Sequence, residues 1–198
     1  MKKLLSLLLT GTLVLFCGGV CSASEINGTE EFNLIDYCES HDIHSKAEFQ
    51  SILDYYVPQE EENNTLDNID GEELAFEIKI DYVNQTVSTE TLYLTDSTRG
   101  SKSGSVSEDT YSALGIKIYS ITVHGSFTYT SNNVSTTSAT GSFDPAPLSP
   151  WTSSPTISSG KVNGKAYARI SGPARFMGNT RSYSLTLTCD TSGNLGSY

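Results

Sequence analysis

Four side chains in the N-terminal part of the chain have the types and the spacing that a metal site needs. They are Cys38, His41, His44 and Glu48, and thiolate, imidazole and carboxylate groups are all zinc ligands. If one helix ran through residues 38–48, the last three would share a face and Cys38 would lie one turn earlier. The segment is strongly acidic, so a hydrated surface explains the same residues. We favour that interpretation and expect no bound cofactor.

A second set of residues partly matches a calcium-binding loop. Asn68, Asp70, Gly71 and Glu77 occupy positions 3, 5, 6 and 12 of the loop pattern. Position 1 would be Leu66, which offers no side-chain oxygen. Glu77 also lies in a segment with strand-like alternation, whereas a helix follows a calcium loop. We therefore interpret this stretch as an acidic linker.

His124 is the histidine of the C-terminal half of the chain and the residue on which a hydrolase hypothesis depends. A catalytic histidine needs a nucleophile beside it and a carboxylate that orients its ring. The sequence has no Gly-x-Ser-x-Gly motif, and its carboxylates form no recognisable pair for glycoside cleavage. Alternation places His124 among hydroxyl side chains on the polar face of a strand. A surface histidine is therefore the preferred interpretation, and a hydrolase is the third hypothesis for function.

The aromatic side chains suggest a sugar-binding surface. The chain has 11 tyrosines and one tryptophan, and exposed aromatic rings stack on sugars in many secreted binding modules. Tyr93 and Trp151 are the candidates for such a surface. We favour the other interpretation, in which most of these rings belong to the core and to cross-strand pairs.

The first 23 residues have the pattern of a secretory signal peptide. Lys2 and Lys3 precede an apolar run over residues 4–16, and small residues end the segment at Ala23. We expect cleavage after Ala23, secretion of the protein, and no membrane association afterwards.

Cleavage would leave two cysteines in the mature chain. Cys17 and Cys21 would be lost with the signal peptide, whereas Cys38 and Cys189 would remain. In an exported protein such a pair indicates a disulfide. The alternative is two unrelated thiols.

Charge divides the mature chain into two parts. Residues 24–81 hold 17 acidic side chains against two lysines, a net charge of −15, whereas residues 82–198 hold 6 acidic and 8 basic side chains, a net charge of +2. Nucleic acid is excluded as a partner because phosphate binding needs clustered lysine and arginine. The partition predicts an acidic N-terminal arm, residues 24–73, on a nearly neutral domain.

The arm contains one helical pattern. Phe49, Ile52, Leu53 and Tyr56 recur at helical spacing, so we predict a short amphipathic helix over residues 45–57. Ser45 begins it with Glu48 three residues later, and Pro58 ends it. The polar stretch that follows, to residue 73, is predicted to be a linker.

From residue 74 onward the hydrophobic period is two, which is typical of strands with one solvated face. The strongest strand pattern covers residues 117–130, and residues 97–107 are predicted to form a turn or a weak edge strand. Seven or so short strands over residues 74–198 predict an all-β fold, a single antiparallel β-sandwich of the immunoglobulin-like kind.

Two stretches resemble a group of small secreted β-sandwich proteins of Gram-positive bacteria. They are Ser120-Ile121-Thr122-Val123-His124-Gly125-Ser126-Phe127-Thr128-Tyr129 and Leu185-Thr186-Leu187-Thr188-Cys189-Asp190-Thr191-Ser192-Gly193-Asn194-Leu195. The resemblance covers about residues 98–198 and implies secretion and a sandwich fold, with no activity to carry over. Relatives carry a second cysteine just after the long strand, where this chain has Ser135-Thr136-Thr137. The resemblance therefore implies that Cys189 has changed its partner to Cys38.

Taken together, these patterns predict a secreted, monomeric, non-enzymatic module that binds an extracellular protein or a surface polymer through strand edges or loop ends. The alternative is a secreted effector or pro-protein whose acidic arm is removed on maturation.

Overall fold

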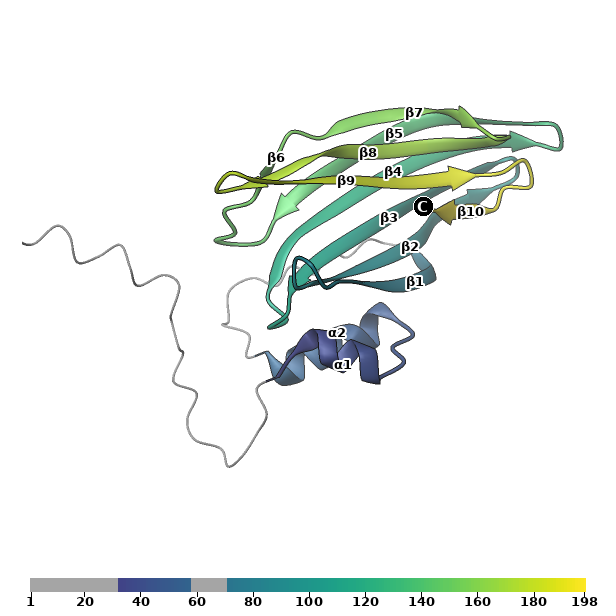
Figure 1. The fold of residues 1–198 in the computed structure, drawn as a ribbon. Coiled ribbons are helices and arrows are strands. Elements are labelled where there is room, and N and C mark those ends of the chain that lie inside the picture. The colour runs from purple at the N-terminus through teal and green to yellow at the C-terminus, as the bar shows by residue number, and fades with distance from the viewer. Residues whose placement is uncertain (1–31, 58–70) are drawn as a thin grey trace, which may run out of the picture. The chain divides into compact units, whose positions relative to one another are not determined.

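A computed structural model describes residues 32–57 and 71–198, and these residues form mostly antiparallel β-sheet with two short helices (Figure 1). Sheet A holds five strands in chain order: β1 (Glu72–Asp81), β2 (Thr86–Thr98), β3 (Ser101–Ser112), β4 (Lys117–Thr130) and β5 (Asn133–Pro145). Sheet B has the order β10-β9-β8-β6, with β7 also paired to β8: β6 (Thr152–Ser153), β7 (Thr156–Val162), β8 (Lys165–Phe176), β9 (Asn179–Cys189) and β10 (Leu195–Ser197). The predicted all-β class is confirmed.

Two of the hairpins that build sheet B have two-residue turns. Asn163-Gly164 joins β7 to β8 with φ values of 50° and 80°, and Met177-Gly178 joins β8 to β9 with 46° and 84°. Positive φ at both central residues gives a turn whose twist matches that of the strands it joins, and glycine adopts it without strain. These turns fix the register of β7, β8 and β9.

The two sheets share one hydrophobic cluster. Sheet A contributes residues such as Val106, Ile121 and Phe127, all fully buried, and sheet B contributes Ile170 and Leu187. The chain passes from sheet A to sheet B once, after β5. An immunoglobulin domain passes between its sheets several times, so the immunoglobulin-like part of the prediction is wrong.

Both helices begin at side-chain caps. The Asn33 carboxamide oxygen accepts from the Ile35 N–H at 2.9 Å before α1 (Leu34–Ser40), and the Ser45 hydroxyl accepts from the Glu48 N–H at 3.2 Å before α2 (Lys46–Tyr56). Such caps satisfy backbone donors that have no partner inside the helix. Helix α2 corresponds to the helix predicted over residues 45–57, whereas α1 is an element that the periodicity did not predict.

The helices pack on the face of sheet A that points away from sheet B (Figure 1). Leu34, Phe49 and Leu53 are at most 2 % exposed and share a second hydrophobic cluster with Val87 of β2 and Tyr111 of β3. Burial of such side chains contributes roughly 1.5–3 kcal/mol each. Residues 32–57 are therefore part of the folded unit, a point that the charge pattern of the sequence left open.

Strand β3 also differs from its prediction. Residues 97–107 were predicted as a turn or weak edge, yet β3 lies in the middle of sheet A between β2 and β4. Small side chains let it be buried on both faces, since Val106 faces sheet B while Ser105 and Ser107 are covered on the other side.

The signal peptide predicted over residues 1–23 and most of the linker lie outside the described residues, as do Leu66, Asn68 and Asp70 of the partial calcium pattern. Gly71 precedes β1 and Glu77 lies within it, as the linker interpretation expects. Across residues 32–57 and 71–198, neither helix is long and apolar enough to cross a membrane.

Candidate functional site

The four candidate metal ligands do not converge. Helix α1 ends at Ser40, and His41 is in an extended conformation with φ −131° and ψ 135°, so one helix does not run through residues 38–48. The His41 ring stacks on Tyr37 at 4.0 Å between centroids, and the His44 N–H donates to the Glu48 carboxylate at 2.9 Å. Among the described residues no cluster of histidine, cysteine and acidic side chains could hold a metal.

Cys38 and Cys189 are both free thiols. Cys38 contacts the cluster under the helices, whereas Cys189 is fully buried in the cluster between the sheets. These clusters lie on opposite faces of sheet A, so the predicted Cys38–Cys189 disulfide is wrong. Burial raises the pKa of each thiol to about 11.

His124 lies on the outer face of sheet A and is exposed. Its neighbours in register are Ser105 on β3 and Thr140 on β5. Partial burial of the ring lowers the pKa of His124. In the described part of the chain no carboxylate is hydrogen-bonded to the ring, so the arrangement lacks the orienting group of a catalytic triad.

The two candidate sugar-stacking rings are in the interior, as the favoured core interpretation expects. Trp151 is 9 % exposed, and it lies between Tyr119 and Phe176 in the core. Tyr93 is 8 % exposed, with the Lys46 ammonium 5.9 Å from the centre of its ring. Neither ring offers a free face to a sugar.

Asp109 of β3 holds helix α2 to sheet A. Its carboxylate is 3.3 Å from the Lys46 ammonium and 3.0 Å from that of Lys117, and it accepts from the Ser120 hydroxyl at 2.7 Å. Burial opposes ionisation, but the two lysines and the hydroxyl outweigh it and lower the pKa of Asp109. This cluster has a structural role, because the ion pair between Asp109 and Lys46, the one lysine of α1 and α2, attaches the helices to sheet A.

Sequence analysis did not predict a row of carboxylates that lies on the face of sheet A opposite the helices. Glu77, Glu90 and Glu108 stand opposite one another on β1, β2 and β3, and the Lys79 ammonium is bonded to Glu90. Burial raises the pKa of Glu108, Lys79 opposes this rise, and the charges of Glu90 and Asp109 add to it. Only strand register could have revealed this row, since the residues are far apart in sequence.

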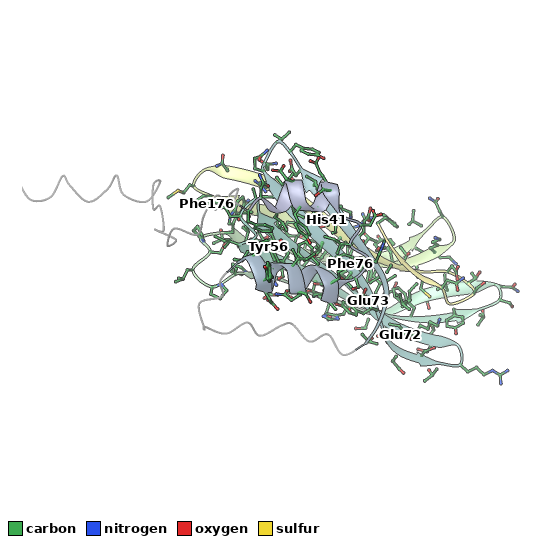
Figure 2. The ribbon with its side chains drawn as sticks, turned by 90° about the horizontal axis from the view of Figure 1, so that it is seen from below. His41, Tyr56, Glu72, Glu73, Phe76 and Phe176 are labelled. Carbon is green, nitrogen blue, oxygen red and sulfur yellow. The ribbon has the colours of Figure 1, made fainter. Side chains whose placement is uncertain are left out.

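Strand β1 combines an open edge with acidic side chains. It ends the strand order of sheet A, and no described residue pairs with its outer edge. The other edge strand, β5, contacts sheet B, where the Thr136 hydroxyl donates to the Tyr167 carbonyl at 2.9 Å. Figure 2 shows Phe76, Glu73 and Glu72 along β1 beside the helices.

Acidic side chains also cover the helices next to β1. Residues 32–57 and 71–81 hold nine acids against two lysines, a net charge of −7. Eight of the acids are exposed, and we call them the acidic surface: Asp36, Glu39, Asp42, Glu48, Asp54, Glu72, Glu73 and Glu77.

No family model, no curated protein and no solved structure matches this chain.

Proposed function

We propose that this protein is a secreted, non-enzymatic binding module whose two sheets form a β-sandwich scaffold. Its partner is an extracellular protein that presents an extended, positively charged segment. The observation that carries the proposal is the unpaired edge of β1, which is lined by glutamates and continuous with the acidic surface.

An unpaired edge strand presents a row of free backbone N–H and C=O groups, and an extended peptide can add to it as a further strand. The backbone bonds supply affinity, while side chains select the partner. Glu72, Glu73 and Glu77 are exposed on β1, with Glu72 and Glu77 on one face and Glu73 on the other, so a segment with lysine or arginine at alternate positions would pair with Glu72 and Glu77. The negative charge of these glutamates also accelerates association with a cationic partner.

The packing of residues 32–57 favours a binding module over a pro-protein that loses its acidic segment. Removal of the helices would uncover Val87 and Tyr111, which are at most 5 % exposed. The isolation of His124 from any carboxylate likewise weighs against a hydrolase.

The test is fluorescence anisotropy with a labelled twelve-residue peptide of alternating lysine and threonine. We expect salt-sensitive binding that a glutamate–threonine peptide does not reproduce. Glu72→Gln, Glu73→Gln and Glu77→Gln combined should weaken binding about tenfold, since each exposed ion pair contributes about 0.2–1 kcal/mol. Amide hydrogen exchange should slow in β1 when the peptide is bound.

The matched control neutralises three acids of residues 32–57, Asp36→Asn, Asp42→Asn and Asp54→Asn, and so changes the net charge equally. We expect this variant to bind with less than a threefold loss. Equal losses in the two triple variants, or binding without slower exchange in β1, would show that the strand edge is not the site.

A further inference from the structure

We propose that the outer face of sheet B is a second binding site, separate from the acidic surface, and that its ligand is an acidic polysaccharide. Arg169 would bind the anionic group of a sugar unit, and Tyr167 would contact the sugar ring.

Arg169 is a half-buried arginine held in place without an acidic partner. Its Nε–H donates to the Thr186 hydroxyl at 2.9 Å, across the β8–β9 ladder. None of the ion pairs formed among the described residues includes it. A guanidinium group has five N–H donors, so the two terminal nitrogens are free to bind a carboxylate or sulfate by two parallel hydrogen bonds.

Tyr167 lies beside Arg169 on the same face. The guanidinium carbon is 5.2 Å from the centre of the Tyr167 ring, a distance at which a cation and an aromatic face attract each other. The ring extends over Gly160 of β7, where an added Cβ would lie 3.0 Å from the Tyr167 hydroxyl and 3.1 Å from Cε1. Glycine at position 160 therefore gives the ring the space in which it lies across the sheet.

Hydroxyl groups and a second tyrosine surround this pair. Ser158 of β7 and Thr186 of β9 stand opposite Arg169 on either side. The Tyr198 N–H donates to the Thr186 carbonyl at 3.2 Å, so strand alternation places the Tyr198 side chain on this face, where it is 57 % exposed. Rings, hydroxyls and one arginine together are the groups that bind a charged sugar polymer.

The charge of sheet B fits an anionic ligand. Residues 152–197 contain five basic side chains and one acid, Asp190, a net charge of +4. The Asp190 carboxylate is occupied within its own turn, since it accepts from the Ser192 and Asn194 N–H groups at 2.8 and 2.9 Å. Five of the eight acids of the acidic surface lie on residues 32–57, beyond sheet A, and the other three lie on the edge strand β1. At physiological salt the field of these charges is screened over about 8 Å.

The test is isothermal titration of the mature protein with polygalacturonate, dextran sulfate, neutral dextran and polyglutamate. We expect binding to polygalacturonate or dextran sulfate, and the stronger of these two identifies the anionic group. Neutral dextran should not bind, and polyglutamate should bind at least fivefold more weakly because it has no sugar ring. Equal binding of polyglutamate would show a general charge effect and overturn the sugar site.

Three variants test whether Arg169 forms the site. Arg169→Gln should weaken binding at least tenfold, whereas Arg175→Gln removes the same charge from an exposed position of the same strand and should change affinity less than twofold. Arg169→Lys keeps the positive charge but cannot donate two parallel hydrogen bonds to one anionic group. It should therefore lose nearly as much affinity as Arg169→Gln.

Gly160→Ala tests the contribution of Tyr167 without removing its ring. The added methyl group would displace the ring, so we expect a loss of threefold or more with the thermal unfolding midpoint almost unchanged. Unaltered affinity in Gly160→Ala, or equal losses in Arg169→Gln and Arg175→Gln, would contradict the proposal.

Discussion

At the scale of single residues, Asp109 shows how one buried carboxylate joins two parts of the chain. It is 3 % exposed and contacts Lys46 of α2, Lys117 of β4 and the Ser120 hydroxyl. We predict that Asp109→Asn lowers the free energy of unfolding by about 3 kcal/mol, because it leaves two lysines without their buried partner. Denaturant titration measures this loss, and Asp144→Asn, at an exposed position on the same face, should cost less than about 0.5 kcal/mol.

The stabilisation from Asp109 should also depend on pH. Lysine charges lower its pKa in the folded protein, so its contribution is complete above the pKa of an unfolded aspartate, about 3.9. It is lost as the pH falls through the lower folded pKa. The difference between the native protein and Asp109→Asn should therefore shrink as the solution is acidified below pH 4, and a constant difference would refute the ion-pair explanation.

Glu108, unlike Asp109, should destabilise the folded protein at neutral pH. It stands opposite Glu90 in a half-buried position, and burial raises its pKa. We predict that Glu108→Gln increases the free energy of unfolding at pH 7 by roughly 0.2–1 kcal/mol, the range for a like-charged cross-strand pair. The gain should vanish near pH 4, because the native carboxylate is protonated in the folded state below its raised pKa. Glu77→Gln, at the exposed end of the same row, should change little at either pH.

At the scale of elements, the β3–β4 turn is where the sheet meets helix α2. Gly115 has φ +79°, and a Cβ there would lie 2.6 Å from a Val57 methyl and 3.1 Å from a Leu53 methyl. Gly164 has φ +80° with nothing within 4 Å. We predict that Gly164→Ala costs about 1 kcal/mol from backbone strain, and that Gly115→Ala costs roughly 1–3 kcal/mol more from overpacking against the helix. Equal losses in the two variants by denaturant titration would mean that the helix does not pack on this turn.

The elements that could be predicted from sequence are those with regular periods. Alternation over residues 74–82 and 117–130 identified β1 and β4, and helical spacing with Ser45 as cap identified α2. Strand β3 was missed because serine and glycine dominate its first half, so no apolar alternation marks it. Its position between two neighbours, rather than its own side chains, makes it a central strand.

The candidate sites could not be predicted in the same way, because they depend on register. Arg169 and Thr186 meet across one ladder, and Glu90 and Glu108 meet across another. The metal hypothesis, which the sequence did not favour, likewise depended on local geometry, since it assumed a continuous helix where the chain turns at His41. A signal for the sheet B face was present, however: buried alanines at positions 166 and 168 place Tyr167 on the opposite, outer face.

At the scale of the whole molecule, charge is distributed between two surfaces, one formed by the helices with the edge strand β1 and the other by sheet B. The helices and β1 carry −7, whereas residues 152–197 carry +4. Binding of a cationic peptide and binding of an acidic polymer should therefore be independent, and saturation with one should not displace the other. In a titration of the two ligands together, competition would mean that one surface accounts for both, and that the two-site description is wrong.

The state of the cysteines links the fold to the expected route of export. Cys38 and Cys189 are free and belong to different clusters, and burial raises both thiol pKa values to about 11. Reaction with iodoacetamide at pH 8 should therefore be slow in the folded protein, because the thiolate is the reactive form.

Unfolding in guanidinium without a reductant should then allow alkylation of both thiols, and the intact mass of protein recovered from the medium reports the number of labels. Two labels on a chain that begins at Ser24 are expected, since Cys17 and Cys21 would have left with the signal peptide. Four labels would mean that the N-terminal segment is retained. Labelling only after reduction would mean that a disulfide forms, and the separation of the two clusters by sheet A would then have to be abandoned.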